Sequence, residues 1–107
     1  MINFDNMLQQ AKELQTKIAE MDKEIENWQE TGVAGGDEVA ITLNGKGVVV
    51  DVVINPSLLN PEQKNILEDL IKAASNNAKE KIQNRLEKYK SDMFANIPMP
   101  PGFKLPF

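Results

Sequence analysis

One long uninterrupted segment constrains the fold more than any other feature of this chain. Between Pro61 and Pro98 there is no proline and no glycine, the residues that most often end a helix. Apolar residues recur there along one side: Leu67, Leu70, Ile71, Ala74, Ala78, Ile82, Leu86, Tyr89 and Met93. The pattern predicts a helix over about 61–93, about 45 Å long. Because a compact chain of this size has a radius of gyration of about 13 Å, the distal turns must protrude or pack on another chain.

The start of this helix is marked by three residues. Asn60 is a favoured N-cap, Pro61 suits the first helical position, and Gln63 occupies the third. We therefore expect the backbone to enter the helix at residue 61.

A second helix is predicted over about residues 4–30, a stretch without proline or glycine. Apolar residues alternate through it at spacings of three and four: Phe4, Met7, Ala11, Leu14, Ile18, Met21, Ile25 and Trp28. This spacing is typical of a coiled-coil stripe. A single amphipathic helix packed on its own sheet is the alternative, but the narrow, long stripe favours a helix–helix contact.

The residues between the helices, about 31–55, have the pattern of a short antiparallel meander. Residues 31–36 (TGVAGG) form a turn or a short edge strand. Val39, Ile41 and Leu43 alternate with polar or small residues, as in a half-buried strand. Asn44-Gly45 suits a tight hairpin, and residues 48–54 form a second strand with five valines. The fold class is therefore α+β, in one domain spanning residues 1–107.

The valine-rich strand and the long helix both need cover that one short chain does not supply. One face of the strand should cover the helices, and a second subunit should cover the other face. We therefore predict a homodimer whose interface includes Val48, Val50, Val52 and Ile54.

Composition excludes several function classes. The chain has no cysteine and no histidine, so thiolate nucleophiles, imidazole bases and His/Cys metal sites are impossible. We expect no catalytic residues, no metal, no cofactor and no small-molecule substrate. The N-terminus lacks the basic region and apolar core of a signal peptide, and no apolar run approaches the ~20 residues of a membrane span. The expected location is the cytoplasm, without a membrane partner.

Charge is unevenly distributed in this acidic chain, whose net charge is −4. Residues 1–30 hold three lysines against seven acids, whereas residues 79–90 hold five cations against two acids. Phosphate binding requires a local cluster of cations, and Lys81, Arg85 and Lys88 share one helix face. The cluster therefore predicts either a phosphate-binding surface or a helix end that complements its own dipole.

The most specific motif is the proline-rich segment 97–107, which holds four of the six prolines. Such a segment suits neither a helix nor a strand, and it is too apolar for an ordinary solvated tail. We predict an extended tail that docks by Phe103, Leu105 and Phe107 on an apolar surface of the dimer. Its last nine residues, MPPGFKLPF, closely resemble the terminal motif of the YbaB/EbfC family, small bacterial nucleoid-associated proteins.

The resemblance extends over nearly the whole chain. Residues 7–18 (MLQQAKELQTKI) are similar to the family's first helix, and residues 39–45 and 53–59 to its central hairpin. The glycine-rich leader common in the family is missing. Where the family often carries basic residues, this chain has Val48, Val49 and Val50, which argues against DNA contact through that strand.

The resemblance implies an αβββα fold and a homodimer that binds double-stranded DNA in the nucleoid. It favours the phosphate-binding interpretation of the cation cluster, with contacts mainly to backbone and shape. The candidate DNA-binding residues are Lys79, Lys81, Arg85, Lys88 and Lys90, together with Lys12 and Lys17 on the first helix. The alternative is an acidic, coiled-coil-like adaptor that binds proteins and has no nucleic-acid role.

Overall fold

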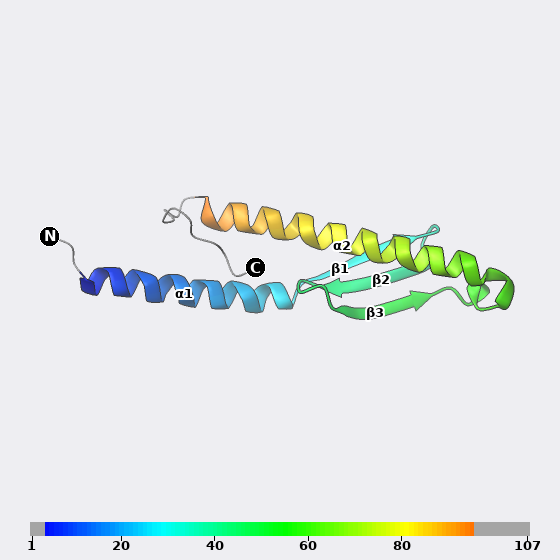
Figure 1. The fold of residues 1–107 in the computed structure, drawn as a ribbon, viewed down its shortest axis with the longest axis horizontal. Coiled ribbons are helices and arrows are strands. Elements are labelled where there is room, and N and C mark those ends of the chain that lie inside the picture. The colour runs from blue at the N-terminus through cyan, green and yellow to red at the C-terminus, as the bar shows by residue number, and fades with distance from the viewer. Residues whose placement is uncertain (1–3, 96–107) are drawn as a thin grey trace.

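The computed structural model describes residues 4–95, which form an α+β fold in the predicted αβββα order. The elements are α1 (Phe4–Glu26), β1 (Gln29–Ala34), β2 (Val39–Asn44), β3 (Val49–Ile54), 3₁₀ turns at Pro56–Leu58 and Pro61–Gln63, and α2 (Lys64–Phe94). Figure 1 shows the three strands with the two helices running beside and beyond them. The tail at 97–107, with its predicted docking residues Phe103, Leu105 and Phe107, lies outside the described residues.

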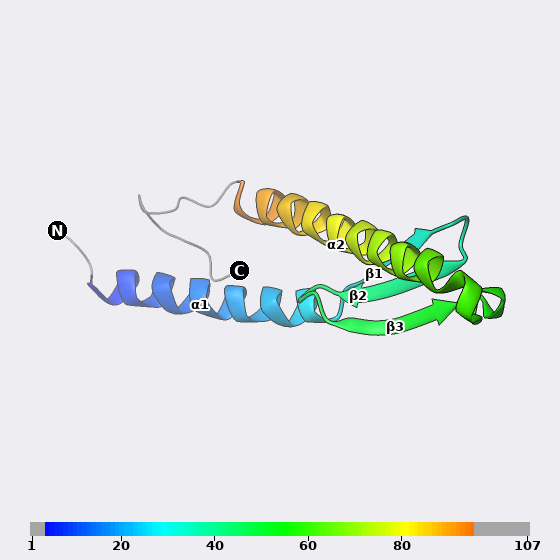
Figure 2. The same cartoon turned by 45° about the vertical axis from the view of Figure 1, so that its right-hand side comes forward.

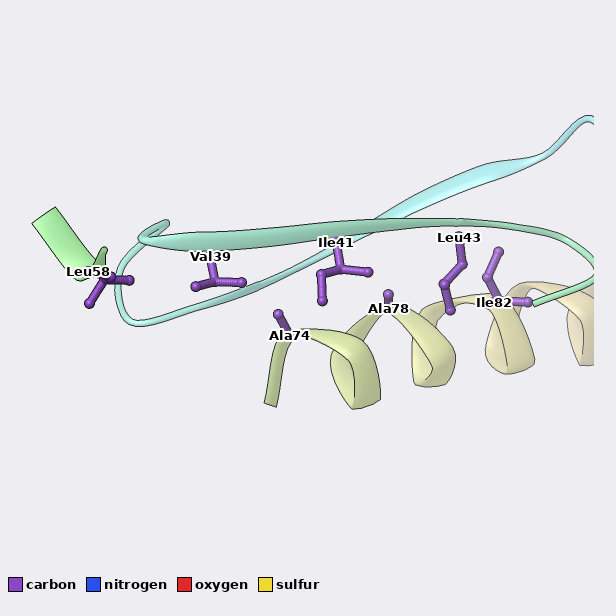
Figure 3. Close-up of a cluster of buried hydrophobic side chains, with 7 residues drawn as sticks. All are labelled: Val39, Ile41, Leu43, Leu58, Ala74, Ala78 and Ile82. Atoms are coloured by element: carbon purple, nitrogen blue, oxygen red, sulfur yellow. The ribbon is translucent and has the colours of Figure 1, made fainter. Parts of the chain in front are cut away.

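The core lies between α2 and one face of the sheet. The strands pair antiparallel in the order β1-β2-β3, and α2 packs against β1 and β2. The alternating side chains of β2 point at the small residues of α2, as Figure 3 shows. The buried cluster consists of Val39, Ile41, Leu43, Leu58, Ala74, Ala78 and Ile82. The alternating apolar side chains of β2 and the apolar side chains on one face of α2 therefore pack together in a single layer.

Close approach of α2 to the sheet depends on Gly32 in β1. A β-carbon at that position would lie 2.1 Å from the carbonyl oxygen of Ala74 and 2.3 Å from the amide nitrogen of Ala78. Ala74 and Ala78 are themselves fully buried. The helix backbone thus packs directly on the strand backbone, which only glycine permits here.

The predicted N-cap of the long helix, Asn60, is confirmed by the structure. The Asn60 side chain accepts a hydrogen bond of 3.1 Å from the backbone N–H of Gln63. The first turn is 3₁₀, and the α-helix proper begins at Lys64. Tightened first turns of this kind are common at helix ends.

The first helix is shorter than predicted, because α1 ends at Glu26 rather than near residue 30. Trp28 turns into the core, and the next residues pair with β2 from Gln29 onward. Within α1 only Met21 and Ile25 are buried, whereas Phe4, Met7 and Leu8 are exposed. The N-terminal part of the apolar stripe of α1 therefore faces solvent in the single chain, Leu14 and Ile18 are half-buried, and only the last two stripe residues of the helix are buried.

Within one chain, the expected helix–helix contact is limited to the inner ends of the two helices, where the Tyr89 hydroxyl of α2 donates to the Glu24 carboxylate of α1. Within residues 4–95, the extensive contacts of α2 are with β1, β2 and the 3₁₀ turns, not with α1. Both helices extend past the sheet in the same direction as two separate arms (Figures 1 and 2). The radius of gyration is 20.0 Å and the longest dimension is 74 Å, which agrees with the prediction that the distal turns protrude.

The β2–β3 hairpin uses its glycines differently from the predicted tight Asn-Gly turn. Positive φ falls on Gly47 (83°), in a longer loop held by Asn44, whose side chain accepts from the backbone of Lys46 and Val48. Gly45 is needed for space instead, since a β-carbon there would lie 1.9 Å from the carbonyl oxygen of Ile25. Close packing of the loop on α1, not turn geometry, explains this glycine.

Candidate nucleic-acid interface

The predicted cation cluster lies on the C-terminal half of α2, here called the α2 arm, which begins over β1 and extends past the sheet. Five positive side chains fall within about three turns of this helix: Lys79, Lys81, Arg85, Lys88 and Lys90. They do not all project from one free face, because two of them contact β1.

Arg85 and Lys81 hold α2 against β1. The Arg85 guanidinium donates to a Glu30 carboxylate oxygen at 2.8 Å and lies over the Trp28 ring, 4.4 Å from its centroid. The Lys81 ammonium donates to the backbone carbonyl of Thr31 at 2.7 Å. The partner of Lys81 is an uncharged carbonyl, so its positive charge is not neutralised. The positive charge of Arg85 is partly neutralised by the Glu30 carboxylate.

A second set of contacts joins the α2 arm to the end of α1. The Tyr89 and Trp28 rings meet edge to face with centroids 4.9 Å apart, a favoured aromatic geometry. The Tyr89 hydroxyl donates to the Glu24 carboxylate at 2.6 Å. Desolvation and the Glu24 carboxylate together raise the pKa of Tyr89 to about 12, so the hydroxyl stays protonated and donating at neutral pH.

This cluster of Trp28, Tyr89, Glu24 and Glu30 is not predicted as a unit by the sequence. Its two aromatic residues belong to separate apolar stripes, and its two acids belong to an acidic flank that resembles a solvated face. The available signal is the presence of the only tryptophan and only tyrosine near the ends of both predicted helices. Their pairing depends on the sheet, which no local pattern specifies.

The other predicted cations on α2 differ in exposure. Lys79 and Lys88 are exposed, and Lys90 is half-buried. On an ideal helix, Lys79 and Lys90 lie on the flank away from β1, and Lys88 lies on the same flank as Lys81. The charges therefore surround the arm rather than form one narrow face.

Lys12 and Lys17 lie in a different environment, in an open groove between α1 and the end of α2. Their neighbours in the groove include four acids, so the lining is negative overall: Asp5, Glu13, Glu20 and Glu24. A polyanion would be repelled by this excess of carboxylates. The structure thus does not unite the α1 lysines with the α2 cluster.

Substitution of Arg85 by glutamate should lower stability as well as change charge. The variant loses the cation–π contact with Trp28 and places a carboxylate near Glu30, so we expect a loss of about 1–2 kcal/mol. Urea denaturation measures it, with exposed Lys88→Glu as the matched control that should remain within about 0.5 kcal/mol of wild type. Equal stability of the two variants would contradict a structural role for Arg85.

The predicted dimer residues lie on or beside β3, the edge strand that α2 leaves uncovered. Val48 precedes the strand, and Val50 lies in a β-bulge without a partner of its own in the register. The exposed fractions of Val50 and Val52 are 46% and 47%, and Ile54 is half-buried. Val49 and Val53, which were not in the predicted set, are also exposed.

Residues 4–95 offer neither a metal centre nor a membrane span. Among these residues, no group of three or more His, Cys, Asp or Glu side chains is arranged to hold a metal ion. In the same range, neither helix is long and apolar enough to cross a membrane.

The chain is similar to known bacterial proteins over nearly its full length. The model of the YbaB/EbfC DNA-binding family matches residues 1–97. A nucleoid-associated protein of Bartonella tribocorum is 52% identical over 102 residues, which are 95% of each chain. A nucleoid-associated protein of Rickettsia felis is 43% identical over 107 residues, covering 100% of both chains.

A solved structure shares the fold. The crystal structure of an uncharacterised protein from Helicobacter pylori superposes with a TM-score of 0.75, covering 88% of this chain and 99% of that one. The sequences are 20% identical, so this likeness concerns the fold alone.

Proposed function

The chain belongs to the YbaB/EbfC DNA-binding family, and we propose that it is a nucleoid-associated protein that binds duplex DNA as a homodimer. The observation that carries this proposal is the family match over residues 1–97, together with nucleoid-associated relatives that align over the whole chain. Binding would organise DNA and affect gene expression. The protein would contact the sugar-phosphate backbone and recognise the shape of the duplex. We place the protein in the cytoplasm, at the nucleoid, with no catalytic role and no cofactor.

The exposed β3 edge supports the homodimer. An unpaired edge with several exposed valines is a surface that folded proteins normally cover. A second copy could meet it through a two-fold axis, so that the same valines contact each other from both sides. The proposed interface contains Val48, Val50, Val52 and Ile54, extended by Val49 and Val53.

The α2 arm supports the location of the DNA contact. Residues 79–90 carry five cations against two acids, whereas α1 carries three lysines against six acids. Because phosphate attraction depends on local charge, the α2 arm is the favoured surface despite the net charge of −4. A dimer would present two such arms to one duplex.

Neutralising cations on the α2 arm should weaken duplex binding without a large effect on the fold. The variant changes Lys79, Lys88 and Lys90 to glutamine, leaving Lys81 and Arg85 in their contacts with β1. We expect about tenfold or greater loss of affinity at low salt, similar for unrelated sequences, because phosphate contacts carry little sequence information. Fluorescence anisotropy with a labelled duplex, titrated with salt, measures this loss.

The matched control removes three charges from α1, with Lys12, Lys17 and Lys23 changed to glutamine. It should bind more tightly than the α2 variant, and its salt slope should change less, since each lost phosphate contact lowers the slope by about 0.9. A larger loss of DNA affinity in the α1 variant would indicate that the DNA-binding site lies on α1. A wild-type protein that binds no duplex even at low salt would overturn the DNA proposal and favour the protein adaptor.

A further inference from the structure

An open groove lies between α1 and the end of α2. The Trp28–Tyr89 contact lies between this groove and the sheet. It has a volume of about 800 Å³, and residues of both helices line it. Its apolar lining comes from Leu8 and Met21 on α1 and from Tyr89 and Met93 on α2. The arms are joined at the inner end by the Tyr89–Glu24 hydrogen bond.

The outer part of this groove is incompletely packed in residues 4–95. Leu8, an apolar residue of α1 that lines the groove, is 59% exposed. In the same residues, α2 makes its extensive contacts with the sheet and not with α1. An amphipathic helix of this kind usually gains most of its stability from packing its apolar face, so the α1 arm needs an occupant in the groove.

We propose that the occupant is the chain's own segment 96–107, bound between the two arms. The segment is separated from Met93, which itself lines the groove, by only two residues, Phe94 and Ala95, so the chain leaves α2 beside the groove. It contains five large apolar side chains suited to this lining: Ile97, Met99, Phe103, Leu105 and Phe107. The segment is therefore tethered to the helix that forms one side of the groove, so its effective concentration at the groove is high.

Length and charge agree with this assignment. Twelve extended residues reach about 40 Å, whereas the groove along α1 from Leu8 to Glu24 spans about 24 Å. The groove has two lysines against four acids, and the one charged side chain of the segment is Lys104. DNA would enter this negative groove against repulsion, whereas a mainly apolar segment with one cation would not.

The consequence is that the segment sets the spacing and rigidity of the two arms. Apolar side chains between α1 and α2 would bury residues of both, and the four prolines lower the entropy lost on ordering the segment. Loss of the segment would let the outer turns of α1 fray without disturbing the sheet. This inference does not rest on the proposed DNA contact, because the groove and the α2 cations are separate surfaces.

Hydrogen exchange on the full-length protein without DNA tests the proposal. The variant changes Phe103, Leu105 and Phe107 to serine, and the control changes Leu59 and Ile66 to serine, two exposed apolar residues away from the groove. We expect the tail variant to raise exchange about tenfold in residues 8–21, with no change in residues 39–43. The control should leave both regions at wild-type rates.

Addition of the synthetic peptide 96–107 to a chain ending at Ala95 gives the second readout. Saturable restoration of protection in residues 8–21 is the expected result. Wild-type exchange in the tail variant would overturn the proposal. Protection that depends on protein concentration and not on the tail would also overturn it, and would assign the groove to a second copy.

Discussion

Replacing Gly32 with alanine should destabilise the protein by about 3 kcal/mol or more, a large part of the 5–15 kcal/mol typical of a folded domain. The added β-carbon would lie 2.1 Å from the Ala74 carbonyl oxygen and 2.3 Å from the Ala78 amide nitrogen. These are backbone atoms of a helix, so no side-chain rotation relieves the overlap. The whole of α2 would have to move away from β1, opening the core against Ile41 and its neighbours on β2.

Urea denaturation followed by circular dichroism measures this loss. Gly36→Asn is the matched control, because Gly36 has φ of 64°, a β-carbon added there would meet nothing within 4 Å, and asparagine tolerates that conformation. The control should remain within about 1 kcal/mol of wild type. A Gly32→Ala protein as stable as the control would show that α2 does not pack against β1 at this distance.

The elements of this fold were predictable because their signals are local. A long run without helix breakers, the Asn60–Gln63 cap and the alternation in β2 each depend on neighbouring residues. The boundaries of α1 were less predictable. Trp28 continues the heptad spacing, yet it is buried outside the helix because the chain must turn there to begin β1.

The candidate site was less predictable than the fold, because its contacts join residues distant in sequence. Lys81, Arg85 and Lys88 share a helix face by spacing, but Lys81 contacts Thr31 and Arg85 contacts Glu30, both on β1. The requirement for glycine at residue 32 likewise comes from α2 and not from a turn. Helical periodicity identifies which residues share one face of α2. Which of those residues contact β1 depends on how the helix packs on the sheet.

The second large effect is expected at Val52, where aspartate should abolish the proposed homodimer. In the single chain Val52 is 47% exposed beside Ile41 and outside the cover of α2, so a charge there costs little. In an interface through β3, the same carboxylate would be buried without a partner, at a cost of several kcal/mol. Because a two-fold interface contains each residue twice, each dimer would bear that cost at two positions.

Sedimentation velocity at micromolar concentration tests this prediction, with wild type expected at about twice the chain mass of 12.0 kDa and Val52→Asp at the monomer mass. Val33→Asp is the matched control, since Val33 is 41% exposed on β1, the opposite edge of the sheet, and should remain dimeric. A Val52→Asp protein that stays dimeric with wild-type stability would place the interface elsewhere. The exposed apolar side chains of α1, Phe4, Met7 and Leu8, would then be the next surface to test, because they lie together at the start of the same helix.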